Sequence, residues 1–267
     1  MKKQKLVLAL GASAVASTNL LAVNSSERYV YDVSGNIIEK KIGNSVTHYE
    51  YQGNRLLKEI GKNGTTLFVN DATGRLSKKV INNGAQVENL YGFSDRLIEV
   101  TSEEGITELF YNASGDLVGK TNGSDSETFI WDGYALAARN DGAFTNEGHV
   151  VGGVPVFFDG KVFVNEASGA TCSVGEIDCE VTAFGESLNE HVVKGLKFMT
   201  GKPYLEELGG FVYPARFYTP ETGRWMTQDP LGFPDGRNQY SFVLNDPINH
   251  IDPMGTCLLY TSPSPRD

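Results

Sequence analysis

Apolar and polar residues recur with a period of about twenty residues between Ser26 and Tyr134. An aromatic residue or Asn heads each unit, at intervals of 20, 19, 21, 20 and 20 residues: Tyr31, Tyr51, Asn70, Tyr91, Tyr111 and Trp131. The apolar residues do not recur at helical spacing, and Gly, Asn, Thr and Val are frequent, which disfavours helix. A fixed period with variable filling is typical of a repeat architecture.

Each unit carries two turn signals that separate short apolar runs. The head residue is followed by a turn such as Asp32–Gly35, after which Ile37 or an equivalent Leu begins a strand. A second turn comes midway, for example at Asn63–Gly64, and Asn-Gly between short strands is a strong hairpin signal. One period therefore predicts two strands and two turns. Together the units predict an all-β fold, a long antiparallel meander of hairpins over residues 26–210 without a sharp internal boundary.

The stretch Phe211–Gly255 is dense in aromatic residues and Arg, and two copies of one turn bracket its second half. These copies are Asp229–Gly232 and Asp252–Gly255, and Asp-Pro-x-Gly suits a β-turn. One hypothesis is that both copies are tight turns closing a cap on the β domain. The other is that Asp229 and Asp252 meet in space as a carboxylate pair. Spacing alone favours the turns.

The two ends of the chain differ from the rest. Within Met1–Ala22, three lysines precede the short apolar run Leu6–Ala16, and Ala-Val-Ala at 14–16 offers a cleavage site. This pattern predicts a signal peptide over residues 1–22, too short in its apolar part to span a bilayer. Cys257–Asp267 (CLLYTSPSPRD) has a reverse translation that resembles the adapter of transposase-prepared sequencing libraries. We interpret it as an adapter artefact rather than a natural Ser/Pro tail, with natural sequence ending near Thr256.

The chain is acidic. It has 23 Lys and Arg against 33 Asp and Glu, and without the two exceptional ends 19 remain against 32. An acidic chain without a basic stripe is a poor candidate for binding nucleic acid or anionic lipid. About 235 residues remain, enough for one sizeable β domain.

Cysteine usage agrees with export. Cys172 and Cys179 are separated by six residues and could close a hairpin loop as a disulfide in an oxidising compartment. Two reduced thiols or half of a metal site are the alternatives. Because no His or further Cys lies at ligand spacing, metal is the least favoured of the three. No phosphate loop, Ser-His-Asp set or Cys-His pair stands out either, so no cofactor is expected.

Three segments follow one another in a fixed order: Ala215–Gly232 (ARFYTPETGRWMTQDPLG), Asn238–Phe242 (NQYSF) and Asn245–Gly255 (NDPINHIDPMG). This series resembles the core-associated signature of the Rhs/YD-repeat family. Thr219 stands where the family usually has Asp, and Asp246 where it has Asn. The twenty-residue units resemble the family's YD repeats, although only Tyr31 and Asp32 keep the bare Tyr-Asp pair.

The resemblance implies a curled or partly spiralled sheet closed by an Rhs core cap at residues 211–255. Relatives that enclose cargo in a hollow shell have many more repeats. With so few repeats, we expect an open or partly curled sheet rather than a sealed container.

The resemblance also implies a catalytic pair. In large toxin-bearing relatives the core cuts its own chain just after the closing Asp-Pro-x-Gly, using aspartates of these motifs. Carried over, these are Asp229 and Asp252, with Arg224 or Arg216 as a supporting cation and the scissile bond after Gly255. One carboxylate would activate water while the other, protonated, assists the carbonyl. Two acids pressed together split their pKa values to give that state.

Three functions follow as hypotheses. The favoured one is an exported bacterial shell protein, secreted or bound to the cell envelope, that encloses or presents a polymorphic C-terminal effector missing from this chain. The first alternative is a self-cleaving aspartic peptidase core that releases this effector, which is the only enzymatic activity expected. The second alternative is a surface module that binds glycan or protein. None of the three calls for a cofactor, a metal, nucleic acid or a membrane span.

Overall fold

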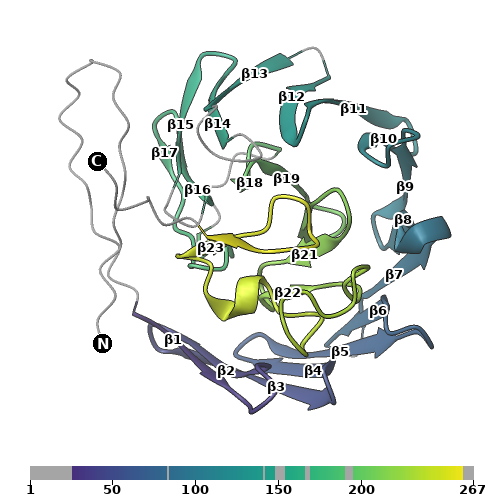
Figure 1. Ribbon diagram of the computed structural model, residues 1–267, viewed down its shortest axis with the longest axis vertical. Helices are drawn as coiled ribbons and strands as arrows, with labels where there is room; N and C mark the ends of the chain where they lie inside the picture. The colour runs from purple at the N-terminus through teal and green to yellow at the C-terminus, as the bar shows by residue number, and fades with distance from the viewer. Residues whose placement is uncertain are drawn as a thin grey trace.

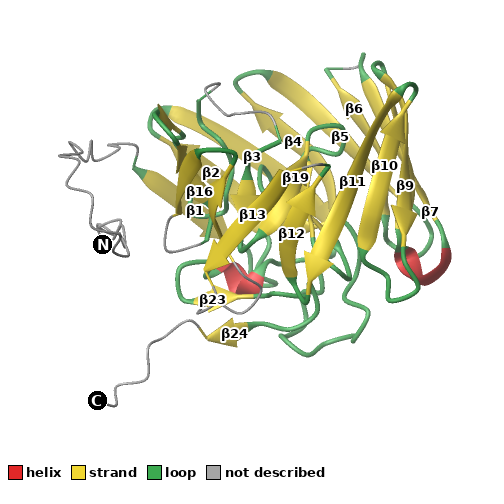
Figure 2. Ribbon diagram, turned by 90° about the horizontal axis from the view of Figure 1, so that it is seen from above, coloured by secondary structure: helices red, strands yellow, loops and turns green. Residues whose placement is uncertain are grey.

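The computed structural model describes residues 26–82, 84–140, 142–147, 154–165, 169–189 and 195–260. The predicted signal peptide (1–22) and residues 261–267 of the predicted adapter segment lie outside this described part. Apart from two short 3-10 turns, η1 (Phe93–Asp95) and η2 (Val243–Asn245), the elements of the described part are β-strands (Figure 1, Figure 2). The predicted all-β fold is confirmed.

Seventeen strands form one sheet, which we call the wall. Each strand pairs antiparallel with the next in the chain, from β1–β2 to β16–β17. The wall curls around the rest of the molecule (Figure 1), so the predicted curled meander is also confirmed. Its strands are β1 (Glu27–Tyr31), β2 (Ile37–Ile42), β3 (Ser45–Gln52), β4 (Arg55–Gly61), β5 (Gly64–Asn70), β6 (Leu76–Ile81), β7 (Gln86–Tyr91), β8 (Leu97–Ser102), β9 (Gly105–Tyr111), β10 (Leu117–Asn122), β11 (Asp125–Asp132), β12 (Ala135–Arg139), β13 (Gly142–Glu147), β14 (Val154–Phe158), β15 (Lys161–Asn165), β16 (Thr171–Val174) and β17 (Ile177–Asp178).

A β-bulge recurs at the same place in successive hairpins of the wall. In the first hairpin Tyr31 pairs with Ile37 and Val30 with Glu39, so Ile38 is an extra residue in the downstream strand. The equivalent extra residues are Leu57, Ser77, Ile98, Val118, Ala137, Val156 and Cys172. A bulge bends its strand and increases the local twist. Its repetition in one register accounts for the steady curl of the wall.

The head residue of each unit fastens that unit to the preceding one. Its side chain donates a hydrogen bond to the carbonyl just before the preceding bulge, as Tyr51 does to Ile37 at 2.9 Å and Trp131 to Leu117 at 2.7 Å. The other donors of this ladder are Asn70, Tyr91, Tyr111, Asn146 and Asn165. The head position needs a side-chain donor long enough to reach this main-chain carbonyl. Tyr, Trp and Asn all supply such a donor, which explains why they replace one another there.

The two ends of the wall approach each other through a small hairpin at residues 181–187, which follows β17. The amide of Ala183 donates to Oε2 of Glu27 on β1 at 3.0 Å. The ring of Phe184 packs edge-on against Tyr29, with centroids 4.9 Å apart. The first and last strands of the wall therefore do not pair with each other. Contacts of the side chains of Glu27 and Tyr29 with the small hairpin bridge the gap between them.

A second, five-stranded antiparallel sheet lies inside the wall (Figure 1), and a two-stranded ribbon lies at one end of it (Figure 2). We call residues 195–260, which contain them, the plug. Its strands are β18 (Phe198–Met199), β19 (Lys202–Leu205), β20 (Gly210–Val212), β21 (Phe217–Thr219), β22 (Arg224–Trp225), β23 (His250–Ile251) and β24 (Leu259–Tyr260). The predicted boundary at residue 210 falls inside this sheet, because β18 and β19 belong to the same five-stranded sheet as β20, β21 and β22.

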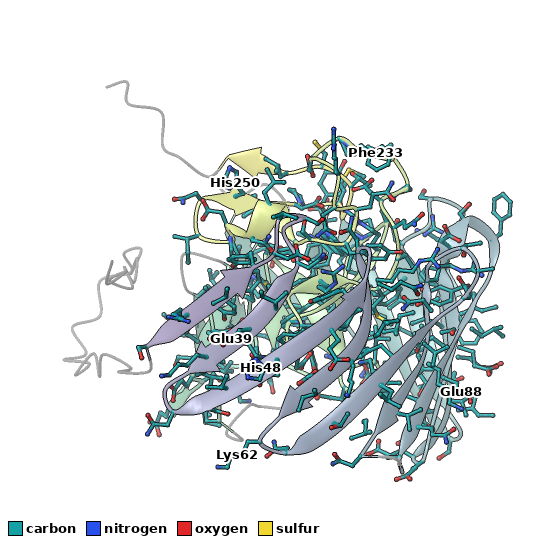
Figure 3. The ribbon with its side chains drawn as sticks, turned by 90° about the horizontal axis from the view of Figure 1, so that it is seen from below. Glu39, His48, Lys62, Glu88, Phe233 and His250 are labelled. Atoms are coloured by element: carbon teal, nitrogen blue, oxygen red, sulfur yellow. The ribbon has the colours of Figure 1, made fainter. Side chains whose placement is uncertain are left out.

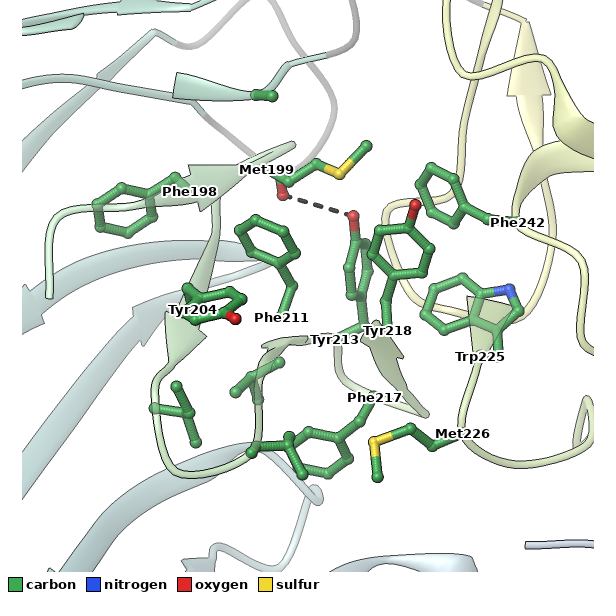
Figure 4. Packing of buried hydrophobic residues seen from close by; sticks show 14 of the residues in the cluster. Phe198, Met199, Tyr204, Phe211, Tyr213, Phe217, Tyr218, Trp225, Met226 and Phe242 are labelled. Atoms are coloured by element: carbon green, nitrogen blue, oxygen red, sulfur yellow. Dashed lines mark hydrogen bonds between the residues drawn. The ribbon is translucent and has the colours of Figure 1, made fainter. Parts of the chain in front are cut away.

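Aromatic side chains fill the centre of the plug (Figure 4). Tyr218 is fully buried and stacks on Phe242 with ring centroids 4.1 Å apart. Trp225 packs against both, at 5.6 and 5.4 Å, and Tyr213 lies edge-on to Trp225 at 5.0 Å. Each such ring buries a large apolar area, so this cluster is a main source of the plug's stability.

Charged side chains on the inner face of the wall reach the structures inside it. Nζ of Lys40 on β2 lies 2.8 Å from Oε2 of Glu186 in the small hairpin. Nζ of Lys120 on β10 lies 2.6 Å from Oε1 of Glu207 in the plug. These contacts join segments more than eighty residues apart in the chain, and they tie the wall to its contents.

Candidate functional site

Asp229 and Asp252 meet at one arginine. Nη2 of Arg216 lies 2.7 Å from Oδ2 of Asp229 and 3.4 Å from Oδ2 of Asp252. Because both distances are measured from the same nitrogen, the two carboxylate oxygens are no more than about 6 Å apart. All three residues are buried. The structure thus brings together the two aspartates singled out in the sequence and one of the two arginines.

Each aspartate is also a turn residue. Oδ1 of Asp229 accepts a hydrogen bond from the amide of Leu231 at 2.8 Å. Oδ1 of Asp252 accepts from four successive main-chain amides: Met254 (3.3 Å), Gly255 (2.7 Å), Thr256 (3.0 Å) and Cys257 (3.3 Å). The two hypotheses from the sequence are therefore compatible, since each carboxylate uses Oδ1 for its turn and Oδ2 for Arg216.

Burial and charge act on the site in opposite directions. Burial raises the pKa of the Asp229 carboxyl, and the nearby Arg216 guanidinium opposes this. Burial also raises the pKa of Asp252, opposed by Arg216 and by the main-chain amides that bind its Oδ1. The pKa of Arg216 is lowered by its own burial. Because both carboxyls share one buried guanidinium, protonation of one aspartate changes the pKa of the other.

The carbonyl of Gly255 belongs to the same site. Nε of Arg216 donates to this oxygen, and Nη1 donates to the carbonyl of Gln239 at 3.1 Å. Gly255 is the residue after which the resemblance places a scissile bond. A guanidinium that donates to a carbonyl oxygen can stabilise negative charge as it develops there during hydrolysis.

An aromatic side chain shields the guanidinium. The centre of the Arg216 guanidinium lies 4.2 Å from the ring centroid of Trp225, which is itself packed against Tyr213. Stacking of this kind stabilises a cation and keeps water from one of its faces. Trp225 therefore covers one face of the Arg216 guanidinium.

Arg224 lies elsewhere. Nη1 of Arg224 donates to Oδ1 of Asn36 on the wall at 3.0 Å, and Nη2 donates to the carbonyl of Asn54. Its guanidinium also lies over the rings of Tyr51 and Tyr240. Arg224 therefore joins the plug to the first two repeat units, and it contributes no contact to the aspartates.

Two residues near the site carried no signal in the sequence. Lys202 is fully buried and donates to the carbonyl of Tyr134 at 2.6 Å, and burial lowers its pKa to about 7 while Asp252 opposes that shift. Oδ2 of Asp235 accepts from the amide of Leu258 at 3.0 Å. Both stand in short Gly- or Pro-containing segments that resemble ordinary turns, so only the folded chain reveals their partners.

Cys172 and Cys179 face each other across the hairpin β16–β17. The amide of Cys179 donates to the carbonyl of Cys172 at 2.8 Å. Residues opposite each other in such a hydrogen-bonded pair have Cα atoms about 5.5 Å apart, within the range that a disulfide spans. The disulfide stays a prediction.

Across the described ranges, no three His, Cys, Asp or Glu side chains come close enough together to hold a metal ion. None of the helical turns in that part of the chain has the length or the apolar character needed to cross a membrane.

The chain resembles segments of much longer proteins. No protein-family model matches it. It is 23% identical over 250 residues to the tRNA3(Ser)-specific nuclease WapA of Bacillus spizizenii, a match that covers 90% of this chain and 8% of WapA. It is 44% identical over 55 residues to the toxin protein Tse5 of Pseudomonas aeruginosa, which covers 21% of this chain and 4% of Tse5. The chain thus spans less than a tenth of the length of either relative.

A solved structure has a similar fold. The crystal structure of TcdB2-TccC3-TEV matches with a TM-score of 0.51 and 17% sequence identity, over 86% of this chain and 17% of that chain. At this identity the likeness concerns the fold alone, and it shows that the fold also occurs as part of a much larger chain. By sequence, the chain is related to part of a bacterial toxin protein.

Proposed function

We propose that the chain is a wall-and-plug segment of an exported bacterial protein of the Rhs/YD-repeat type, and that it presents a C-terminal effector which follows Gly255 in the natural coding sequence. The observation that carries this proposal is the filled interior. Buried aromatic side chains of the plug occupy the centre of the wall. A plug in that position favours presentation of a following domain over its enclosure by this segment.

The relatives support a toxin-associated structural role. One is named a nuclease and another a toxin, and this chain corresponds to a small part of each. A part that consists of a curled wall and a hydrogen-bonded plug is suited to holding and displaying a neighbouring part. The predicted signal peptide over residues 1–22 supports export, with the mature protein secreted or bound to the cell envelope.

An epitope placed after Asp267 tests presentation. In the folded chain, an antibody should bind this epitope as well as it does in the urea-unfolded chain, because the plug already fills the interior of the wall. An epitope that becomes accessible only on unfolding would show that the wall encloses the downstream residues. An epitope inserted between Gly123 and Ser124, at a turn of the wall, is the matched control for antibody access.

Self-cleavage after Gly255 is the second candidate, and the contact between Arg216 and the Gly255 carbonyl favours it. Water would add to this carbonyl carbon with its proton going to a carboxylate of the pair. The bond to Thr256 would then break as the leaving amine takes up a proton. One carboxyl of the pair would hold a proton while the other, ionised, takes up the proton from water. Arg216 would stabilise the oxyanion.

Binding of a glycan or protein at the surface of the module stays a prediction from the sequence.

A further inference from the structure

The last residues of the plug, 254–260, lead toward the downstream chain, and we call them the departing chain. They are held through the main chain just before the Gly255–Thr256 bond. The amide of Ala215 donates to the carbonyl of Met254 at 2.9 Å. Arg216 donates to the carbonyl of Gly255. Both contacts use groups that every residue possesses, so they do not depend on the side chain at position 254.

Main-chain contacts continue beyond the bond. Oδ1 of Asp252 accepts from the amides of Thr256 and Cys257 at 3.0 and 3.3 Å. Oδ2 of Asp235 accepts from the next amide, that of Leu258, at 3.0 Å. Two carboxylates from different loops of the plug therefore bind three successive amides of the departing chain.

The departing chain then pairs as a strand. In the ribbon β23–β24, His250 lies opposite Tyr260 and Ile251 opposite Leu259. Phe233, two residues before Asp235, and His250 lie at the same end of the molecule, opposite Lys62 (Figure 3). The contacts of residues 254–260 are thus gathered at one end of the wall (Figure 2).

We propose that Asp235 and Asp252 form a clamp that binds an extended polypeptide of almost any sequence by its main-chain amides. Here the bound amides are those of residues 256–258, of which 257 and 258 belong to the segment that we interpret as adapter-derived. This inference rests on the proposed function, because it describes how the downstream chain is presented. Asp235 is a positioning residue in it, since its carboxylate contacts the amide of Leu258 and no atom of the Gly255–Thr256 bond.

The chemistry of the contacts defines what the clamp accepts. Every residue except proline has an amide hydrogen, so three successive main-chain donors exclude proline at 256–258 and tolerate other residues. Strand pairing adds further contacts that do not depend on side chains. The side chain of Leu258 packs against the hydrophobic core, which adds a preference for an apolar residue at that position. A plug with such a clamp can present many different downstream sequences in one path.

Amide hydrogen exchange, followed by NMR on the purified chain, tests the clamp. In the wild type, the amides of residues 256–258 should exchange at least about tenfold more slowly than in an unfolded peptide. Asp235→Ala should remove the protection of Leu258, and Asp235→Asn should retain part of it, because the amide oxygen of Asn still accepts. Asp246→Ala is the matched control, since that carboxylate is bonded to Asn249 in a neighbouring turn.

Sequence tolerance is tested by replacing residues 256–258 with three alanines, which should preserve the slow exchange at 256 and 257, and by Leu258→Pro, which should weaken it. Unprotected amides in the wild type, an unchanged Leu258 rate in Asp235→Ala, or loss of protection in the alanine variant would overturn the clamp. The intact mass of the same samples reports hydrolysis separately. A protected chain that is never cut refutes only self-cleavage. Loss of protection at Leu258 counts against the clamp only in uncut chains, because cleavage by itself would release residues 256–258.

Discussion

At the residue scale, the position of each arginine on the hairpin β21–β22 decides whether it contacts the two aspartates. The paired turns and the resemblance singled out Asp229 and Asp252, and the structure brings them to one cation. The choice between the two arginines needed the fold. Arg224 pairs with Thr219 beside the turn of the hairpin β21–β22, whereas Arg216 precedes β21 at its other end. Neighbours in sequence therefore serve different partners, one the aspartates and the other the wall.

Asparagine substitutions separate chemistry from folding at this site. With a reporter domain fused after Asp267, self-cleavage should release a reporter that begins at Thr256 and leave a chain that ends at Gly255, both detected by intact mass. Asp229→Asn and Asp252→Asn should each abolish release, because Asn keeps the turn hydrogen bond but cannot transfer the proton. Asp246→Asn, another Asp before Pro, should cleave as the wild type does. Release that persists in both of the first two variants would reduce these aspartates to turn residues.

Gly255 is required by both its backbone and its surroundings. Its φ is +77°, and an added Cβ would lie 3.2 Å from Cβ of Tyr213 and 3.3 Å from the amide nitrogen of Arg216. Gly255→Ala should lower the free energy of unfolding by about 2–3 kcal/mol, as measured by urea denaturation. Gly232, with φ +86° and nothing within 4 Å of an added Cβ, is the matched control. Gly232→Ala should cost only about 1 kcal/mol, and equal losses would contradict a crowded site.

At the element scale, the sequence predicts the repeat well as long as the head residue is aromatic or stands at the regular interval. The unit headed by Asn146 departs from the interval, and the next one is headed by Asn165, so neither stood out as a repeat. Both nevertheless donate to the carbonyl before a bulge, at Leu136 and Pro155. The bulges themselves left no local signal, because the extra residue ranges from Ser to Leu.

The ladder of head residues predicts a position-dependent effect of removing one hydroxyl. Tyr111→Phe removes the donor to the Leu97 carbonyl and should lower the free energy of unfolding by about 1 kcal/mol in urea denaturation. Tyr31→Phe is the matched control, because Tyr31 heads the first unit and has no earlier unit of the wall to fasten. A similar loss in both variants would show that the hydroxyls act in some way other than by joining units.

At the scale of the whole molecule, the sequence predicted that a C-terminal segment closes the sheet as a cap. It did not predict that this segment lies inside the wall. Its position depends on contacts between residues far apart in the chain, such as Lys40 with Glu186 and Arg224 with Asn36. A charged residue in a strand suggests a solvent-facing position when only the sequence is known. Inside this wall, the same charges face the small hairpin and the plug, which no local pattern indicates.

The burial of Glu186 beside Lys40 makes the stability of the fold dependent on pH. Burial raises the pKa of Glu186 to about 7, with Lys40 opposing the shift. A carboxyl whose pKa is higher in the folded state stabilises the fold below its ordinary pKa, and loses this contribution as the pH rises through 7. The stability of the wild type relative to Glu186→Gln should therefore fall between pH 5 and pH 8, by up to about 3 kcal/mol.

Urea denaturation of both proteins at several pH values measures this difference. Glu88→Gln is the matched control, because Glu88 is exposed on the outside of the wall, where it pairs with Lys78 (Figure 3). The stability of Glu88→Gln relative to the wild type should not vary between pH 5 and pH 8. A difference for Glu186→Gln that stays constant, or grows with pH, would show that Glu186 is not buried against the wall.

The natural coding sequence downstream of Thr256 is the sharpest test of a plug that presents an effector. The genomic reading frame should continue past Gly255 and encode a further domain that resembles a toxin, in place of the residues Cys257–Asp267. A stop codon within a few codons of Thr256 would leave the plug with nothing to present, and would contradict the proposed function.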